Sequence, residues 1–352
     1  MPADHVHFNG SVNLGDAESV MREIASRVPS GLRRIPDGET GDRGNWIFFQ
    51  LQKFLQLPWL VPDRPLGAAD GEYEQLPRLR LAEGADPGQV TWPDIGYADA
   101  YLESYRVFAG LRADGVIPAG VRFQVEYPTP LASISGYIVP EQQQALLDSY
   151  ERAMFADLGR LLAAVPADEV AVQWDVAVEF GTLEGAFGPG GAQAFDAIIA
   201  ALARCVDQVP AEISAGLHLC YGDYGHQHFM QPASLALQVR VLNAVTAAAR
   251  RPVSFVSFTV PQYQREESYF APLAGLHADL GTELNFALVP YHPAEQAAGT
   301  TGDQARLIDT ALAASPDGRR DWGICTECGM GRVDRDDVPV LLDLHREIIT
   351  AP

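Results

Sequence analysis

The sequence predicts a single (β/α)₈ barrel, and three features of the chain support this fold class. Eight short apolar runs recur along the 352 residues, and helix-like segments separate most of them. Such alternation is typical of parallel strands joined by right-handed crossovers, and eight units fit a closed barrel. No Gly-x-Gly-x-x-Gly motif follows the first run, which disfavours the alternative of an open doubly wound sheet.

The predicted strands are short and apolar, as buried strands of a parallel sheet are. In chain order they cover residues 5–10, 32–39, 121–127, 169–175, 212–220, 253–259, 283–290 and 322–328. The predicted helices between them have helical periodicity or recognisable ends. They cover residues 16–28, 141–165, 193–209, 232–250, 303–314 and 337–349.

Residues 57–99 interrupt this alternation. The segment is rich in Pro, Gly, Asp and Glu, contains Trp59 and Trp92, and is too long for an ordinary connection. We interpret it as an insertion between strands two and three of one barrel domain that spans residues 1–352. We predict that it covers the barrel mouth; the alternative is a packed surface excursion with no role in binding.

Composition and charge exclude several classes of protein. The formal net charge of −21 argues against nucleic acid and anionic membrane surfaces as partners. No apolar run approaches the roughly 20 residues that cross a bilayer, and the N-terminus lacks signal-peptide features. Four cysteines in a chain of this length fit a reducing compartment, so we expect a cytoplasmic protein. The oligomeric state is not indicated.

Reactive side chains gather at one end of the predicted barrel. In this fold the active site lies at the carboxyl ends of the strands. Six of the eight predicted strands carry a charged, polar or thiol side chain there. Buried groups of this kind cost stability unless they are paired, so a purely structural protein would have little reason to gather them at one end. The strand-end residues are Asn9, Ser11, Asp37, Glu39, Asp175, His218, Cys220, His292 and Cys328.

Three of these residues form a candidate metal site. His218 and Cys220 are two residues apart, so on a strand their side chains point to the same face. Cys328 follows the last apolar run. Two sulfurs and one nitrogen favour Zn²⁺, and three protein ligands leave the open position of a catalytic zinc. The alternative is two core cysteines and a hydrogen-bonded strand histidine.

The ordered set of motifs resembles the catalytic barrel of cobalamin-independent methionine synthase and its single-barrel relatives, within the uroporphyrinogen decarboxylase-like superfamily. In that family a His-x-Cys on strand five and a Cys-Gly on strand eight hold zinc. His218-Leu219-Cys220 and Cys328-Gly329 match these motifs. The resemblance therefore implies zinc as the cofactor.

The same resemblance implies roles for four further residues. Gly10-Ser11 matches a Gly-Ser on strand one that cradles a substrate carboxylate through backbone amides. Glu39 and Asp175 match the acidic residues that bind the substrate amino group, and His292 matches a candidate proton donor. Glu39, Asp175 and His292 could instead be helix-capping or loop residues.

The implied reaction is methyl or alkyl transfer to a thiol. A thiol with a pKa of about 8.5 is mostly protonated at neutral pH, and zinc coordination leaves a metal-bound thiolate that can attack an electrophilic carbon. The implied partners are a small-molecule thiol acceptor and a methyl or alkyl donor. Alternatives are a zinc-thiolate lyase or epoxide-opening thiol transferase, a decarboxylase-like enzyme, and a non-catalytic member of the superfamily.

Departures from the family pattern keep these alternatives open. Thr259 stands where the synthases place a further zinc-binding Glu on strand six, so water, substrate, Asp223, His226 or His228 could fill the fourth position. The tail Cys328-Gly-Met-Gly-Arg332 is one residue shorter than the family's, so Arg332 has no clear counterpart. The long N-terminal domain of the synthases is absent from the sequence, which argues against an ordinary folate-dependent synthase.

Overall fold

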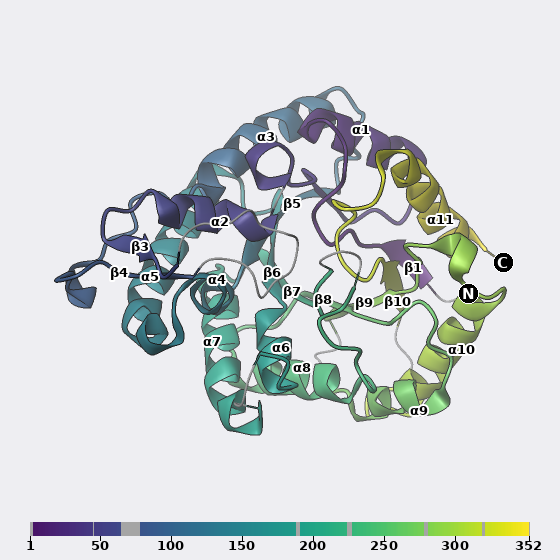
Figure 1. Ribbon diagram of the computed structural model, residues 1–352. Helices are drawn as coiled ribbons and strands as arrows, with labels where there is room; N and C mark the ends of the chain where they lie inside the picture. Colours follow the sequence, from purple (N-terminus) through teal and green to yellow (C-terminus); the bar gives the residue numbers. More distant parts are fainter. Residues whose placement is uncertain are drawn as a thin grey trace.

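A ring of parallel strands forms the centre of the molecule, and helices surround it (Figure 1). The computed structural model describes residues 3–44, 46–64, 78–187, 191–223, 227–277, 281–318 and 321–351. The strand order is β1-β10-β9-β8-β7-β6-β5-β2. Two parallel bridges, Val6 with Leu32 and Ser11 with Gly38, then join β1 to β2 and complete the ring. The predicted fold class, an α/β barrel of the (β/α)₈ type, is confirmed.

Each predicted apolar run overlaps one barrel strand, although β1 begins two residues before its run and β5 and β6 each end one residue after theirs. The strands are β1 Ala3–Val6, β2 Arg34–Pro36, β5 Arg122–Pro128, β6 Val170–Val176, β7 Ser214–Leu219, β8 Phe255–Phe258, β9 Glu283–Ala287 and β10 Trp322–Cys325. Several end earlier than the runs that predicted them. The polar residues at the ends of those runs, such as Glu39 and Cys328, therefore lie in the loops at the barrel mouth.

The helices lie outside the ring (Figure 1). The α-helices are α1 Ala17–Arg27, α2 Trp46–Leu55, α3 Tyr97–Ala113, α4 Pro130–Tyr137, α5 Pro140–Ala164, α6 Val178–Leu183, α7 Phe195–Gln208, α8 Ala236–Ala248, α9 Glu267–Phe270, α10 Thr300–Ala313 and α11 Val338–Thr350. Short 3₁₀ turns are η1 Gly41–Gly44, η3 Pro87–Gln89, η4 Gly191–Ala194, η5 Ala271–Gly275, η6 Pro293–Glu295 and η7 Arg335–Asp337. Within the described part of the chain, no helix combines the length and apolar character that a membrane crossing requires.

The described parts of residues 57–99 pack beside the barrel. Strands β3 (Leu60–Pro62) and β4 (Leu79–Leu81) form an antiparallel pair. Leu79 bridges to Ile138, and the Trp92 indole donates a hydrogen bond to Ser149 Oγ at 3.0 Å, on the long helix α5. Residues 65–77 lie outside the described residues, and the predicted cover over the mouth stays a prediction.

Strand β6 illustrates how the barrel wall separates apolar from polar side chains. Trp174 points outward and meets Phe155 of α5, with ring centroids 5.9 Å apart. Gln173 and Asp175 point inward, because successive side chains of a strand face opposite sides. Their neighbours repeat the pattern, so the inside of the barrel is lined by buried polar side chains. These are His7, Asn9, Gln124, Glu126, Gln173, Asp175, His218, Ser257 and Asn285.

A buried ion cluster closes the amino-terminal end of the barrel. Glu283 at the start of β9 pairs with Arg34 of β2, and His5 Nε2 lies 3.2 Å from the same carboxylate. The Arg34 guanidinium stacks 4.0 Å above the ring centroid of Phe255. Gly323 leaves room for this cluster, since a Cβ there would lie 2.4 Å from the His5 ring. Burial opposes ionisation of Glu283, but Arg34 and His5 outweigh it and hold the pKa of Glu283 well below its usual value.

We predict that Glu283→Gln destabilises the protein by about 3 kcal/mol at neutral pH, because it leaves the buried Arg34 charge without its partner. A carboxylate with a lowered folded-state pKa stabilises above its unfolded pKa and loses that contribution as the pH falls. Chemical denaturation between pH 7 and pH 3 should therefore show the largest difference at neutral pH. Glu18→Gln, which removes an exposed i,i+4 pair with Arg22, is the control and should change little. Equal effects of the two changes would contradict a stabilising role for the buried pair.

Candidate metal centre

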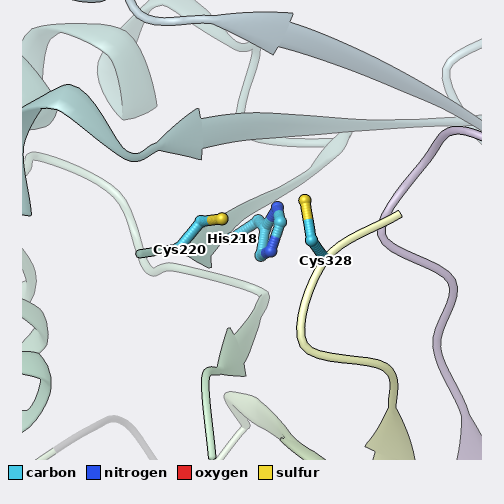
Figure 2. Close-up of side chains that lie close together, drawn as sticks. All are labelled: His218, Cys220 and Cys328. Atoms are coloured by element: carbon cyan, nitrogen blue, oxygen red, sulfur yellow. The ribbon is translucent and has the colours of Figure 1, made fainter. Parts of the chain in front are cut away.

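Three side chains from two strand ends meet across the barrel mouth. His218 lies in β7, Cys220 follows that strand directly, and Cys328 lies in the loop after β10. Figure 2 shows the His218 ring between the two cysteines. One donor atom from each residue lies within 4.8 Å of the other two. The His-x-Cys spacing and the distant Cys328 are thus brought together as the sequence predicted.

The donor set suits zinc in both chemistry and size. Zn–S bonds of about 2.3 Å and Zn–N bonds of about 2.0 Å place tetrahedral donors roughly 3.5–3.8 Å apart. Donors within 4.8 Å of one another would need to close by about 1 Å at most. His218 and Cys220 are buried, and Cys328 is partly exposed towards a cavity. Such a site would leave one coordination position open to a small molecule.

Proton release from Cys328 and His218 would accompany metal binding. A hydrogen bond with Cys220, together with burial, raises the pKa of the Cys328 thiol well above its usual value. Burial disfavours the charged His218 ring, but the hydrogen bond to Asp175 and the Cys328 sulfur outweigh it and raise the pKa of His218 to about 9. Metal affinity at such a site increases with pH, because the metal competes with these protons.

A carboxylate orients the His218 ring. Its Nδ1 lies 3.1 Å from Asp175 Oδ1, which also accepts a hydrogen bond of 2.9 Å from Gln173 Nε2. Metal-binding histidines typically donate their second nitrogen to a carboxylate in this way. His218 Nε2, the nitrogen left for a ligand, lies 3.3 Å from the Glu327 carbonyl oxygen.

A cavity of about 70 Å³ lies beside the candidate metal ligands. Its lining includes His218, Cys220 and Cys328 together with the predicted substrate-binding residues Ser11, Glu39 and Asp175. Asp223 and Arg332 also line it, with Arg332 Nη1 3.5 Å from Asp223 Oδ2. The cavity therefore presents one guanidinium and several carboxylates to a small ligand.

Glu39 is held in an unfavourable state on the cavity wall. Its backbone φ is 52°, and its side chain is 3% exposed. Its Oε1 has no hydrogen-bond partner among the described residues. Burial and the nearby carboxylates of Glu126 and Asp175 raise the pKa of Glu39 well above its usual value. A residue strained in this way is typical of a binding site, where a cationic ligand group offsets the cost.

Two glycines bring Ser11 against the tail of β10. A Cβ at Gly329 would lie 2.2 Å from Ser11 Oγ, and a Cβ at Gly331 would lie 2.7 Å from Ser11 Cβ. Met330 N donates to Ser11 O at 2.6 Å, so the two segments pair like short strands. The Cys-Gly-Met-Gly tail thus places Cys328 and Ser11 on the same cavity.

His292 and Thr259 lie elsewhere at the mouth. His292 precedes η6 and is not among the described residues that line the cavity. Its backbone N donates to Gln262 Oε1 at 3.2 Å, and its role as proton donor stays a prediction. Thr259 Oγ1 donates to the Leu219 carbonyl at 2.8 Å. His226 lies outside the described residues.

Sequence reasoning missed two buried charges beside the site. Glu126, at the inner face of β5, accepts hydrogen bonds from Gln124 Nε2 at 2.8 Å and from the Tyr101 hydroxyl at 3.2 Å. Arg43 forms a buried ion pair with Asp37, with Nη2 and Oδ2 2.5 Å apart. Gln124 and Glu126 alternate with Val125 in an apolar run, and this pattern could have predicted that both polar side chains face the inside of the barrel.

Comparisons with known proteins support the fold. No protein-family model matches the chain, and no curated protein matches it. Among solved structures, the chain is similar to a candidate vitamin-B12-independent methionine synthase from Listeria monocytogenes. The match covers 99% of this chain and 98% of that one, with a TM-score of 0.55 and 12% sequence identity. The resemblance to methionine synthase barrels is thereby confirmed at the level of the fold.

We predict that Glu39→Gln stabilises the protein at neutral pH, because an acid with a raised folded-state pKa loses stability as the pH rises above its unfolded value. Asp37→Asn, two residues away, should destabilise by about 3 kcal/mol, because it leaves the buried Arg43 unpaired. Thermal unfolding at pH 5 and pH 8 measures both effects, and the gain from Glu39→Gln should be larger at pH 8. A similar loss in both variants would contradict the strained state of Glu39.

Proposed function

We propose that the protein transfers a methyl or other alkyl group to a small-molecule thiol, with zinc held by His218, Cys220 and Cys328. The observation that carries the proposal is the set of one nitrogen and two sulfur donors within 4.8 Å, on the wall of a cavity. The whole-length fold similarity to a candidate methionine synthase supports the same class of scaffold. Zinc would supply Lewis acidity that lowers the pKa of a substrate thiol from about 8.5.

Glu39 and Asp175 bind the amino group of the thiol substrate in this proposal. Both hydrogen bonds that Asp175 accepts use Oδ1, and its other oxygen, Oδ2, belongs to a residue that lines the cavity. Glu39 Oε1 is buried and has no hydrogen-bond partner among the described residues. An ammonium group has three donors and a positive charge, so it would satisfy both oxygens and relieve the repulsion that raises the pKa of Glu39.

The substrate carboxylate would bind on the Ser11 side of the cavity. Gly10 has a φ of 120°, which an L-residue rarely adopts, and its neighbours Asn9 and Ser11 both line the cavity. Successive backbone amides in such a turn attract anions. Arg332 lines the same cavity and supplies the positive charge that Ser11 lacks.

We assign the transfer of a proton to the leaving group to His292. Its loop is tied to the site by two hydrogen bonds through Gln262. Gln262 Oε1 accepts from His292 N, and Gln262 N donates to Glu327 Oε1 at 2.8 Å, next to Cys328. Imidazole is the side chain that most often serves as a general acid in enzymes.

Thr259 supports a second candidate reaction, the opening of an epoxide or a related lyase step by the same activated thiol. The synthases place a carboxylate where Thr259 stands, and the Thr259 hydroxyl is bonded to the Leu219 carbonyl. The two candidates share the thiol site and differ in the electrophile. Product analysis with a methyl donor and with an epoxide distinguishes them.

We predict about one zinc per chain in the purified protein, and loss of that zinc in Cys220→Ser and in Cys328→Ser, because a hydroxyl is a much poorer zinc ligand than a thiolate. Elemental analysis beside a folding assay measures this. Cys205→Ser is the matched control, since Cys205 is buried in α7, away from the barrel mouth, and should leave zinc unchanged.

A folded, metal-supplemented wild type without zinc would contradict the proposed function. Zinc retained in both site variants would contradict the assigned ligands. With cobalt in place of zinc, a thiol that changes the visible spectrum would identify the acceptor.

A further inference from the structure

We propose that Gln173 and His7, inside the barrel below the cavity, are positioning residues that orient the His218 ring through Asp175. The inference rests on the proposed function, because it concerns zinc binding at the candidate metal centre. Neither Gln173 nor His7 is among the described residues that line the cavity. They would act on the metal through hydrogen bonds alone.

A continuous line of hydrogen bonds joins these residues. His7 Nε2 lies 2.8 Å from Gln173 Oε1, and Gln173 Nε2 lies 2.9 Å from Asp175 Oδ1. Asp175 Oδ1 lies 3.1 Å from His218 Nδ1. The line therefore crosses from the residue after β1 through β6 to β7 and ends on the candidate ligand.

The neighbours of each group determine which atom donates. Gln173 Nε2 faces two acceptors, Asp175 Oδ1 and the Asn9 carbonyl oxygen at 3.2 Å, so this end of the amide must be the NH₂ group. Gln173 Oε1 therefore faces His7, whose Nε2 must carry a proton. Arg34 Nη2 lies 3.5 Å from His7 Nδ1 and faces the nitrogen that accepts.

The charge state of His7 agrees with this direction. Burial and the nearby Arg34 charge lower the pKa of His7 well below its usual value, which keeps the ring neutral. A neutral ring carries one proton, and the contact with Gln173 places it on Nε2. Each member of the line thus has a single consistent role as donor or acceptor.

The consequence for His218 is a defined ring orientation and tautomer. Gln173 holds the Asp175 carboxylate in position, and Asp175 accepts the Nδ1 proton of His218. Nε2, the nitrogen available to a metal, is then the one that gives up its proton and presents its lone pair when a metal binds. These residues are at most 7% exposed, so water cannot readily replace a lost partner. Removal of such a partner typically weakens metal binding by about 10- to 100-fold.

The barrel offers a matched control on the neighbouring strand. Gln124 of β5 is buried like Gln173, and its Nε2 also donates to a carboxylate two residues along and to a carbonyl of the β1 segment. The carboxylate belongs to Glu126, at 2.8 Å, and the carbonyl to Phe8, at 2.6 Å. Gln124 therefore resembles Gln173 in type, burial and the bonds of its Nε2, but its Oε1 has no partner among the described residues and its carboxylate is not bonded to His218.

The test compares Gln173→Met with Gln124→Met. Both changes keep the side-chain size and remove one buried amide, so similar losses of thermal stability are expected. Zinc affinity is measured by competition with a chelator, and the cobalt-substituted proteins are compared by visible absorption. We expect about a 10- to 100-fold weaker zinc affinity and an altered cobalt spectrum for Gln173→Met. Gln124→Met should retain the wild-type affinity and spectrum.

Wild-type zinc affinity in a folded Gln173→Met protein would overturn the inference, and so would an equal loss in both variants. A wild type that binds no zinc would overturn the proposed function itself, which keeps the two failures distinct. If Gln173→Met does not fold, His7→Phe keeps a planar ring and removes the donor to Gln173. The same weakening of zinc binding is expected there, and its absence would also overturn the inference.

Discussion

The polar groups inside the barrel must find hydrogen-bond partners inside the barrel, and the rest of the structure depends on this constraint. Inward positions of such barrels are usually filled by branched apolar side chains. Here amides, imidazoles and carboxylates occupy many of them. A buried polar group without a partner costs about 1–3 kcal/mol, and His7, Asn9, Gln173 and Asp175 are each bonded to neighbours on other segments of the barrel. The orientation of His218 is thereby coupled to the packing of the barrel interior.

The two ends of the barrel differ in how charge is balanced. At the amino-terminal end, Glu283 is paired with Arg34 and supported by His5, which serves stability. At the mouth, Glu39 is buried beside other carboxylates, with a backbone conformation that costs energy. Proteins accept such local costs where a ligand is bound. The contrast agrees with the proposed ligand-binding site at the carboxyl-terminal end, where this fold class has its active sites.

Much of the fold followed from local patterns in the sequence. A period of two put His218 and Cys220 on one face, and the order of strands and helices brought Cys328 to the same end. Other features depend on contacts between distant residues, which a local pattern does not contain. Position 329 must be glycine because a Cβ there would clash with Ser11, which is more than three hundred residues earlier in the chain. The Tyr101 hydroxyl of α3 donates a hydrogen bond to the Glu126 carboxylate of β5, and no local pattern in either segment predicts this contact.

The central claim is a zinc site of two sulfurs and one nitrogen at the barrel mouth. X-ray absorption at the zinc edge of the purified protein tests it most directly. We predict two sulfur neighbours at about 2.3 Å and nitrogen or oxygen neighbours at about 2.0–2.1 Å, in a four-coordinate site. A spectrum with only nitrogen and oxygen neighbours, or with six of them, would contradict the claim. In that case the buried carboxylates at the mouth would have to serve a different ligand.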